Sequence, residues 1–425
     1  MSFADEYLAR RHFVPRISDP PAQCPGIIAV VPCCNEPDLL RSLQSLHEAA
    51  TPGCFTEVII VINHAENANR EVKQQNERSW HVARIWANDH CSRYLRFHPI
   101  IVPDVPAKDA GVGFARKTGM DEAAYRFNLS DADDGVIVAF DADAVCDTNY
   151  LVEIERCFAR PQVNGASIYY EHPVEGREFT PDIYEGAILY ELHLRYLNQA
   201  MRYAGFPYAY HTVGSSFAVR ASAYVKQGGM NKRKAGEDFH FLHKIIPLGN
   251  YAEINTTRVI PSPRISDRVP FGTGASIRRW MREGQTALYT YPVELFDGLK
   301  AFFALVSGFY PFDAEKIRQL CASLPVPMQV YLEANDYLGQ IAAVCRNSSS
   351  AERFQKRFPT WFGGLHIVKY LNYGCGDYFV KQPAGEAATA LLHRLNYRNI
   401  PSSDKELLFL YRAIERSGYV HESPK

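Results

Sequence analysis

Apolar runs and stretches of helical periodicity alternate along the first third of the chain. Three runs rich in β-branched residues have the length of buried strands: "GIIAVVP" (26–32), "EVIIVIN" (57–63) and "YLRFHPIIVPD" (94–104). The segments between them, and "AGVGFARKTGMDEAAYRF" after them, place apolar residues at helical spacing. A fourth apolar run covers 136–140. Strands that are apolar on both faces and alternate with helices predict an α/β fold with a mainly parallel sheet flanked by helices.

The composition changes on either side of this alternating region. Residues 1–25 predict a short helix followed by a proline-rich entry, "SDPPAQCPG". After residue 270 the chain consists of helical segments rich in aromatic residues, such as "ELLFLYRAIERSG". We therefore predict an N-terminal extension over 1–25, an α/β domain over 26–270 and a mostly α-helical C-terminal region over 271–425.

Charge and hydropathy limit the partners and the location of the protein. Lys and Arg number 46 against 47 Asp and Glu, and no run of one sign occurs, which argues against nucleic acid as a partner. The first residues, "MSFADEYLARRHFVP", lack the apolar core of a signal peptide, and the run at 301–312 is too short to span a bilayer. We expect a cytoplasmic protein without a transmembrane segment, and peripheral membrane contact stays open. The ten cysteines lack zinc-site spacing and are expected to be free thiols.

The fourth apolar run leads directly into two carboxylates, in "VIVAFDADAV" (136–145). Residues two apart along a strand point the same way, so Asp141 and Asp143 are expected to face one ligand. Unpaired charges at the end of a buried strand are costly, and oxygen ligands suit Mg²⁺ or Mn²⁺, which also binds substrate phosphates. The pair is therefore predicted to hold a divalent metal. The alternative is turn chemistry, in which these aspartates and Asp147 only cap the next segment.

Four segments resemble, in this order, the family 2 glycosyltransferases, which have the Rossmann-like GT-A fold. They are "IIAVVPCCNEPDLLRSLQSL", "AKDAGVGFARKTGMDEA", "VAFDADAV" and "GSSFAVRASAYVKQGGMNKRKAGEDFHF". The second is similar to the family's Gly-x-x-x-Ala-Arg-x-x-Gly segment, the third to its Asp-x-Asp motif, and the fourth ends in its Glu-Asp pair. The resemblance implies an inverting, metal-dependent enzyme that moves a sugar from a nucleotide-diphosphate sugar to a hydroxyl. A UDP-sugar is the favoured donor, and the acceptor is a glycan, a lipid-linked or a small molecule.

The resemblance also assigns residues to the donor site. Asp141 would contact the ribose or the metal, and Asp143 would hold the metal against the diphosphate. Three residues at the end of the first strand would line the pocket for base and ribose: Pro32, Asn35 and Glu36. Where the family usually has an aspartate after the second strand, this chain has "INHAEN". Asn63 takes that position, and the choice of base, uracil or another, stays open.

A helix entered through glycines follows the third strand, in "AKDAGVGFARKTG". Asp109 is expected to cap this helix, while Gly111 and Gly113 let its positive N-terminal end approach a ligand. Lys108 and Arg116 add positive charge beside it. On this segment alone, contact with the donor and simple helix capping are both open.

A basic segment that contains glycines lies further along, "PSPRISDRVPFGTGASIRRW" (261–280). Its four arginines are Arg264, Arg268, Arg278 and Arg279. They are predicted to clamp the diphosphate leaving group, because guanidinium offers paired donors to phosphate oxygens, and Arg268 is assigned to the donor site. The alternative is a solvated loop. "SIRRW" faintly resembles the Gln-x-x-Arg-Trp motif of processive family members, but Ser276 replaces the glutamine, so polymer synthesis coupled to export is not expected.

Glu237 and Asp238, in "AGEDFHFLHKI", follow a glycine and begin an apolar helix. Acidic residues at a helix start also complement its dipole, which is the structural alternative. Sugar transfer with inversion needs one carboxylate to take the proton of the acceptor hydroxyl. The resemblance gives this role to Asp238, with Glu237 as partner to the acceptor or to Asp238. It places Gly214 and Ser215 under the donor sugar or the acceptor.

Two other functions compete with glycosyl transfer. "VAFDADAV" also fits a HAD-type phosphohydrolase with Asp141 as nucleophile. That superfamily places the motif near the start of its core domain, whereas here four segments match the transferases. The second is a nucleotide-sugar-binding relative without turnover, and the intact Glu-Asp pair argues against it.

Overall fold

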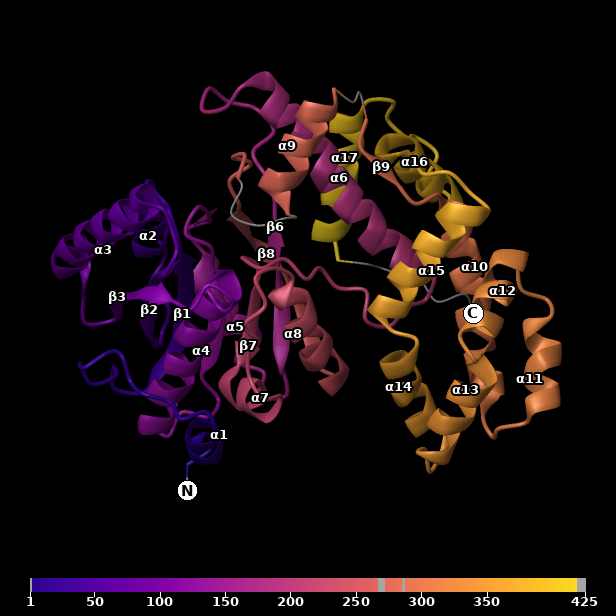
Figure 1. Cartoon of the computed structure of the whole chain (residues 1–425), viewed down its shortest axis with the longest axis horizontal. Helices are drawn as coiled ribbons and strands as arrows, with labels where there is room; N and C mark the ends of the chain where they lie inside the picture. The colour runs from indigo at the N-terminus through magenta and orange to yellow at the C-terminus, as the bar shows by residue number, and fades with distance from the viewer. Residues whose placement is uncertain (1, 267–271, 285–286, 419–425) are drawn as a thin grey trace. The chain divides into compact units, whose positions relative to one another are not determined.

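The structure is a computed structural model that describes residues 2–266, 272–284 and 287–418. It divides into two compact units, which are both visible in Figure 1. The first unit comprises residues 1–173, 211–275 and 416–425, and the second comprises residues 174–210 and 276–415.

The first unit contains a sheet with eight strands among the described residues, in the order β3-β2-β1-β4-β7-β6-β8-β5 (Figure 1). The strands are β1 Pro25–Cys33, β2 Phe55–Ala65, β3 Leu95–Val105, β4 Val136–Ala139, β5 Val145–Cys146, β6 Gly165–Tyr170, β7 Phe217–Arg220 and β8 Tyr251–Ile260. The pairs β3–β2, β2–β1 and β1–β4 are parallel, and so is β6–β8. β7 runs antiparallel to both β4 and β6. The predicted α/β class with its parallel strands is confirmed.

The register of the parallel strands brings the polar segments to one edge of the sheet. Ile27 pairs with Val136 and Val30 pairs with Ala139, so β1 and β4 run in parallel toward the same edge, and β1 continues past the end of β4 to Cys33. The β-branched side chains that predicted these strands are buried, and Val30 is 0% exposed. The loops that follow β1 and β4 therefore lie beside each other, at the carboxyl edge where ligands of α/β sheets bind.

Helices cover this sheet, and α4 packs against β1 and β2. The helices of the first unit are α1 Asp5–Arg10, α2 Leu39–His47, α3 Arg70–His90, α4 Val112–Leu129, α5 Tyr150–Phe158, α7 Ala221–Lys226, α8 Glu237–Ile245 and the 3-10 turn Ile246–Leu248. α9, Thr273–Glu283, begins in the first unit and continues into the second. The helices predicted after each of the first three strands are confirmed.

The Asp-x-Asp segment lies in a turn and does not extend the strand. The N–H of Phe140 donates to the carbonyl of Val30 at 3.1 Å, and β4 itself ends at Ala139. The N–H of Ala144 then donates to the carbonyl of Asp141 at 3.1 Å, which closes a turn. The expectation that strand geometry aligns the two aspartates is therefore wrong, because the chain leaves the sheet one residue before Asp141.

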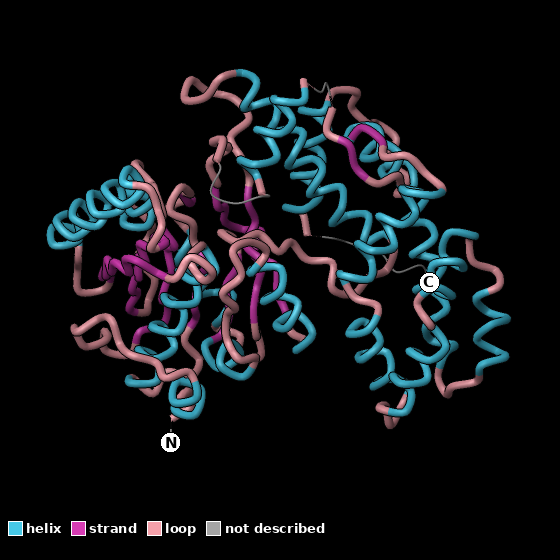
Figure 2. The backbone as a smooth tube through the Cα atoms, in the orientation of Figure 1, coloured by secondary structure: helices cyan, strands magenta, loops and turns pink. Residues whose placement is uncertain are grey.

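The second unit is mainly helical (Figure 2). Its elements are α6 Pro181–Tyr203, β9 Tyr289–Thr290, α10 Val293–Leu305, the 3-10 turn Val306–Phe309, α11 Ala314–Cys321, α12 Val326–Ala334, α13 Tyr337–Arg346, α14 Ala351–Trp361, α15 Gly364–Asp377, β10 Gln382–Pro383, α16 Ala384–Arg394 and α17 Asp404–Arg416. Aromatic side chains fill its core, and the rings of Phe302 and Phe362 lie 4.7 Å apart. The predicted helical C-terminal region is confirmed. No helix in the described ranges combines the length and the apolar character that crossing a membrane requires.

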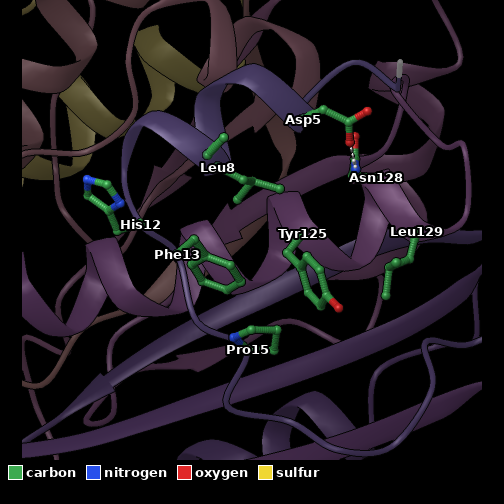
Figure 3. A pocket seen from close by; sticks show the side chains of 9 residues that line it. Asp5, Leu8, His12, Phe13, Pro15, Tyr125, Asn128 and Leu129 are labelled. Carbon is green, nitrogen blue, oxygen red and sulfur yellow. Dashed lines mark hydrogen bonds between the residues drawn. The ribbon is translucent and has the colours of Figure 1, made fainter.

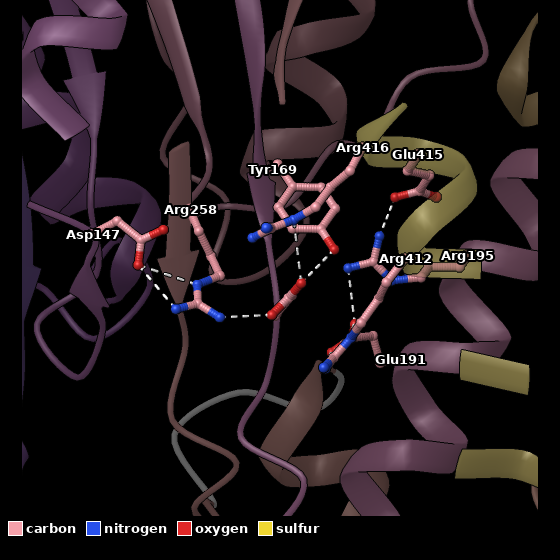
Figure 4. Close-up of polar contacts among 9 residues, drawn as sticks. Asp147, Tyr169, Glu191, Arg195, Arg258, Arg412, Glu415 and Arg416 are labelled. Atoms are coloured by element: carbon pink, nitrogen blue, oxygen red, sulfur yellow. Dashed lines mark hydrogen bonds and ion pairs between the residues drawn. The ribbon is translucent and has the colours of Figure 1, made fainter. Parts of the chain in front are cut away.

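A buried ionic network ties α17 to α6 within the second unit (Figure 4). Glu191 is 0% exposed, and its Oε1 accepts hydrogen bonds from Arg195 Nε at 2.8 Å and Arg412 Nε at 2.7 Å. Its Oε2 accepts a bond from Arg412 Nη2 at 2.9 Å. Arg195 also pairs with Glu415 on α17. This network joins α6, from the middle of the sequence, to α17, the C-terminal helix.

Replacing Glu191 by glutamine should destabilise the second unit by about 3–5 kcal/mol, because two buried guanidinium groups lose the charge that compensates them. Urea unfolding followed by circular dichroism measures the change. Glu352→Gln is the matched control, since Glu352 pairs with Lys356 at the surface and solvent screens that pair. Equal stability of Glu191→Gln and wild type would contradict the structural role of the network.

Candidate active site

Arg116 lies at the centre of an acidic cluster beside the Asp-x-Asp turn. It sits near the start of α4 and is 1% exposed. Its Nη2 donates to Asp141 Oδ1 at 2.7 Å, and its Nη1 donates to the carboxylate of Glu237. Burial opposes the charged guanidinium, but the charges of Glu237, Asp141 and Asp238 together raise the pKa of Arg116. One buried cation therefore joins the Asp-x-Asp turn to the Glu-Asp pair.

Glu237 and Asp238 form the first turn of α8, directly after Gly236, which has a left-handed φ of 68°. Burial raises the pKa of Glu237 to about 7, against the attraction of Arg116. Burial likewise raises the pKa of Asp238, again against Arg116. Glu237 is only 3% exposed, whereas Asp238 is partly exposed. Of the two carboxylates, Asp238 therefore has the access to solvent that contact with a substrate requires.

Gly214 lies where Arg116 and Asp238 meet. A Cβ atom at this position would lie 2.9 Å from Arg116 Nη2 and 3.0 Å from Asp238 Oδ2. The absence of a side chain therefore leaves room for both charged groups beside the backbone. Ser215 follows with a side chain that is buried, and its Oγ lies 3.3 Å from Ser216 Oγ. The structure thus brings Gly214 into the acidic cluster and turns the side chain of Ser215 into the protein.

The N-terminus of α4 is capped differently from the prediction. Gly111 is the N-cap residue, and no side chain bonds to the free N–H groups there. The expectation that Asp109 caps this helix is therefore wrong. Its Oδ2 lies instead 3.6 Å from Lys232 Nζ, on the segment that precedes α8. Lys108 is exposed beside it.

Gly113 allows the segment that precedes α8 to pack on the first turn of α4. A Cβ atom at Gly113 would collide with the backbone carbonyl of Arg233. Asn231 shapes this segment, because its Oδ1 accepts the N–H of Arg233 at 3.0 Å and its Nδ2 donates to the carbonyl of Glu237 at 3.2 Å. Sequence reasoning did not single out Asn231, since one asparagine in "GMNKRKAG" gives no signal for this role.

The residues assigned to the nucleoside pocket lie at the ends of β1 and β2. Pro32 is buried within β1. Asn35 is exposed after β1 and has a left-handed φ of 50°. Asn63 is 2% exposed, and its Nδ2 donates to the carbonyl of Gly111 at 3.3 Å, which links the end of β2 to the start of α4.

Of the four arginines predicted to act together, Arg264 reaches the Asp-x-Asp turn. Its Nη2 lies 3.8 Å from Asp143 Oδ2. Arg268 falls outside the described residues. Arg278 and Arg279 lie on α9 and are exposed. The prediction of one basic loop that carries all four is wrong, because the chain becomes helical at Thr273.

Two carboxylates at the turn fit the divalent ion that the sequence predicts. The side chains of Asp141 and Asp143 are 35% and 26% exposed, and both offer hard oxygen donors. Mg²⁺ commonly takes one or two carboxylates from the protein and completes its shell with water and substrate phosphates. In the part of the chain that the structure describes, no three His, Cys, Asp or Glu side chains converge on one point.

A separate hollow lies at the other end of α4 (Figure 3). It has a volume of about 350 Å³ and is lined by α1 residues such as Leu8 and by Tyr125 and Leu129 of α4. A hydrogen bond of 2.8 Å from Asn128 Nδ2 to Asp5 Oδ1 closes one side. No residue assigned to the donor or acceptor lines this hollow.

The profile of glycosyl transferase family group 2 matches residues 136–368, which is more than half of the 425-residue chain. The chain belongs to this family. The match begins with β4 and includes the Asp-x-Asp turn, Gly214 and the Glu-Asp pair. This glycosyltransferase therefore has its acidic cluster within the family region, which decides against the phosphohydrolase alternative.

Solved structures of other glycosyltransferases are similar to this chain at low TM-scores. TarS residues 1–349 of S. aureus, in complex with UDP-GlcNAc, is 12% identical, with a TM-score of 0.40 and coverage of 79% of this chain and 92% of that chain. The mannosyltransferase PcManGT from Pyrobaculum calidifontis, in complex with GDP-Man and Mn²⁺, is 15% identical, with a TM-score of 0.34. The match covers 97% of this chain and 94% of that chain. No curated protein matches the sequence.

Proposed function

We propose that this family member is an inverting, metal-dependent glycosyltransferase that uses a nucleotide-diphosphate sugar and a hydroxyl acceptor. The observation that carries the proposal is the convergence of Asp141, Glu237 and Asp238 on the buried Arg116. These groups are the metal-binding and proton-accepting residues that the family resemblance assigns. Their meeting at the carboxyl edge of a parallel sheet supports one site for donor and acceptor.

In this proposal the Asp-x-Asp turn binds the diphosphate of the donor through a divalent ion. Asp143, with Asp141 beside it, would hold Mn²⁺ or Mg²⁺, which supplies positive charge to the leaving diphosphate. The partial exposure of both carboxylates, 35% for Asp141 and 26% for Asp143, supports the binding of such an ion. Arg116 orients Asp141 by its 2.7 Å hydrogen bond.

Asp238 is the proposed general base. Its carboxylate takes the proton of the acceptor hydroxyl, and the acceptor oxygen attacks the anomeric carbon of the donor sugar. The bond from this carbon to the diphosphate breaks on the opposite face, and the electron pair leaves with the diphosphate. The configuration at the carbon is therefore inverted. Glu237, held by Arg116, positions Asp238 or the acceptor.

The nucleoside is assigned to the ends of β1 and β2, near Pro32, Asn35 and Asn63, and a UDP-sugar is the favoured donor. Thermal unfolding of the protein with a panel of nucleotide sugars, with and without Mn²⁺, tests this assignment. A ligand that binds only the folded state raises its stability by mass action. Mn²⁺-dependent stabilisation by a nucleotide sugar supports the proposal. If no nucleotide sugar of the panel stabilises the protein, the proposal is contradicted.

Asp143→Ala should abolish the part of nucleoside diphosphate binding that depends on the metal, because it removes one of the two carboxylates proposed to hold the ion. Isothermal titration with UDP and with GDP, in Mn²⁺ and in EDTA, measures the effect. We expect affinity in Mn²⁺ to fall to the value in EDTA.

The matched control is Asp147→Asn, which lies just after β5. Asp147 accepts hydrogen bonds from Arg258 at 3.0 and 3.2 Å and is committed to that pair (Figure 4). Its variant should bind the nucleotide as wild type does. If Asp143→Ala keeps the full Mn²⁺-dependent affinity, the metal assignment is wrong. Binding of a nucleotide sugar without transfer or hydrolysis would instead identify a non-catalytic relative.

A further inference from the structure

Glu36 is fully engaged by protein groups. Its side chain is 0% exposed, although the family resemblance assigns it to the pocket for base and ribose. Its Oε1 accepts hydrogen bonds from Arg264 Nη1 at 3.0 Å and from the N–H of Asp38 at 3.1 Å. Its Oε2 accepts a bond from Arg264 Nη2. Both carboxylate oxygens are therefore occupied, and the buried side chain offers no surface to a nucleoside.

The backbone around Glu36 is also fixed by α3. The hydroxyl of Ser79 donates to the carbonyl of Glu36 at 2.8 Å. The N–H of Asn35 donates to Asn76 Oδ1 at 2.7 Å. Both α3 residues are buried. Glu36 therefore stands on a rigid support, from which it holds the guanidinium of Arg264 in one orientation.

Arg264 uses only part of its hydrogen-bonding capacity on Glu36. Guanidinium has five N–H donors in a planar arrangement. Its Nη2 lies 3.8 Å from Asp143 Oδ2 and its Nη1 lies 3.9 Å from Asp38 Oδ2, which are ion-pair distances but too long for hydrogen bonds. Among the described residues, Glu36 is the one acceptor to which this side chain is hydrogen bonded. Arg264 is 30% exposed, so its remaining donors are open to a ligand at the turn.

We propose that Arg264 contacts the diphosphate of the donor and that Glu36 is the positioning residue that aims it. This inference rests on the proposed function, because it assigns residues to the same donor site. A guanidinium bound to a carboxylate on one edge donates to phosphate oxygens on another, a geometry that a lysine ammonium does not reproduce. As the bond to the sugar breaks, negative charge grows on the diphosphate. A fixed cation within reach of Asp143 stabilises that charge.

The test compares binding of nucleoside diphosphate and monophosphate. Isothermal titration in Mn²⁺ uses UDP against UMP, and GDP against GMP. Arg264→Gln should weaken the diphosphate by about 10- to 100-fold, the range for a hydrogen bond to a charged group, and the monophosphate by less. Arg264→Lys should recover part of the loss, since it restores the charge without the fork. In transfer assays Arg264→Gln should raise the KM for the donor and lower kcat.

Asp38→Asn is the matched control. Asp38 also faces Arg264, at 3.9 Å, but its side chain is 75% exposed. Solvent screens that contact, so the variant should bind both nucleotides as wild type does. A loss of affinity in Asp38→Asn equal to that in Arg264→Gln would mean that any substitution beside this ion pair disturbs the site, and it would overturn the specific role of Arg264.

A double-mutant cycle separates positioning from direct contact. If Glu36 acts through Arg264, Glu36→Gln weakens the diphosphate in the wild-type background and has no further effect in the Arg264→Gln background. If Glu36 instead contacts the nucleoside, it weakens monophosphate and diphosphate alike in both backgrounds, which overturns the inference. The double variant also removes both members of the Glu36–Arg264 pair together, which is less disruptive than removing one.

Failure of this inference is distinguishable from failure of the proposed function. If wild type binds neither UDP nor GDP, the proposed function fails. If wild type binds one of them and Arg264→Gln binds it equally well, the proposed function stands and the role of Arg264 is wrong.

Discussion

Asp238→Asn should leave nucleotide-sugar binding intact and lower the rate of transfer by about 10²- to 10⁴-fold, the contribution typical of a general base. Asparagine has nearly the shape of aspartate, so the contacts around Gly214 and Arg116 persist. Its amide does not accept the proton of the acceptor hydroxyl. Steady-state transfer rates at saturating donor measure the loss, and isothermal titration measures donor affinity.

The pH dependence of transfer gives a second readout of the same group. Burial raises the pKa of Asp238, so the wild-type rate should fall as the pH is lowered through that raised value. Asp238→Asn should lack this acidic limb. Asp89→Asn, an exposed aspartate on α3, is the control and should transfer at the wild-type rate. A normal rate in Asp238→Asn would mean that another group accepts the proton.

Arg116→Gln should lower the free energy of unfolding by about 3–5 kcal/mol near neutral pH, because it leaves buried carboxylates without their cation. Glu237 is 3% exposed and its pKa is already raised to about 7 by burial. Without Arg116 this pKa rises further, so the folded state binds more protons than the unfolded state. Stability of the variant should therefore recover as the pH is lowered. Urea unfolding near neutral pH and in mild acid measures both effects.

Arg126→Gln is the matched control for Arg116→Gln. Arg126 lies on the same helix, is 1% exposed, and pairs with the buried Glu57 at 2.9 Å. Its variant should lose comparable stability but keep donor binding, whereas Arg116→Gln should lose both. Arg116→Lys should restore the charge and only part of the geometry. An Arg116→Gln variant as stable as wild type at neutral pH would contradict the central role of this cation.

The strands around the site follow from local sequence. β-branched runs at 26–32 and 57–63 are buried at the predicted positions, since apolar residues on both faces have no stable place except inside a sheet. The helix after each of these strands likewise follows from the helical spacing of its apolar residues. The position of β7 between β4 and β6 does not follow from local sequence. Pairing between strands that are far apart in the chain leaves no periodic pattern in the sequence of either strand.

The candidate site was predictable as a set of residues and not as a geometry. The motif segments pointed to Asp141, Asp143 and the Glu-Asp pair. They left open whether the two aspartates continue the strand or lie in a turn, since the same residues after an apolar run are compatible with both. They assigned Asp109 to a cap, because the sequence does not show that this carboxylate lies beside Lys232.

The sequence by itself determined the parallel strands, the acidic segment at their carboxyl edge and the helical region that follows. These depend on burial and periodicity, which neighbouring residues encode. Only the tertiary structure decided that Arg116 joins Asp141, 25 positions away, to Glu237, 121 positions away, and that Arg264 is held by Glu36, 228 positions away. A buried charge is stable only beside its partner, and which partner it meets is fixed by how the strands and helices pack.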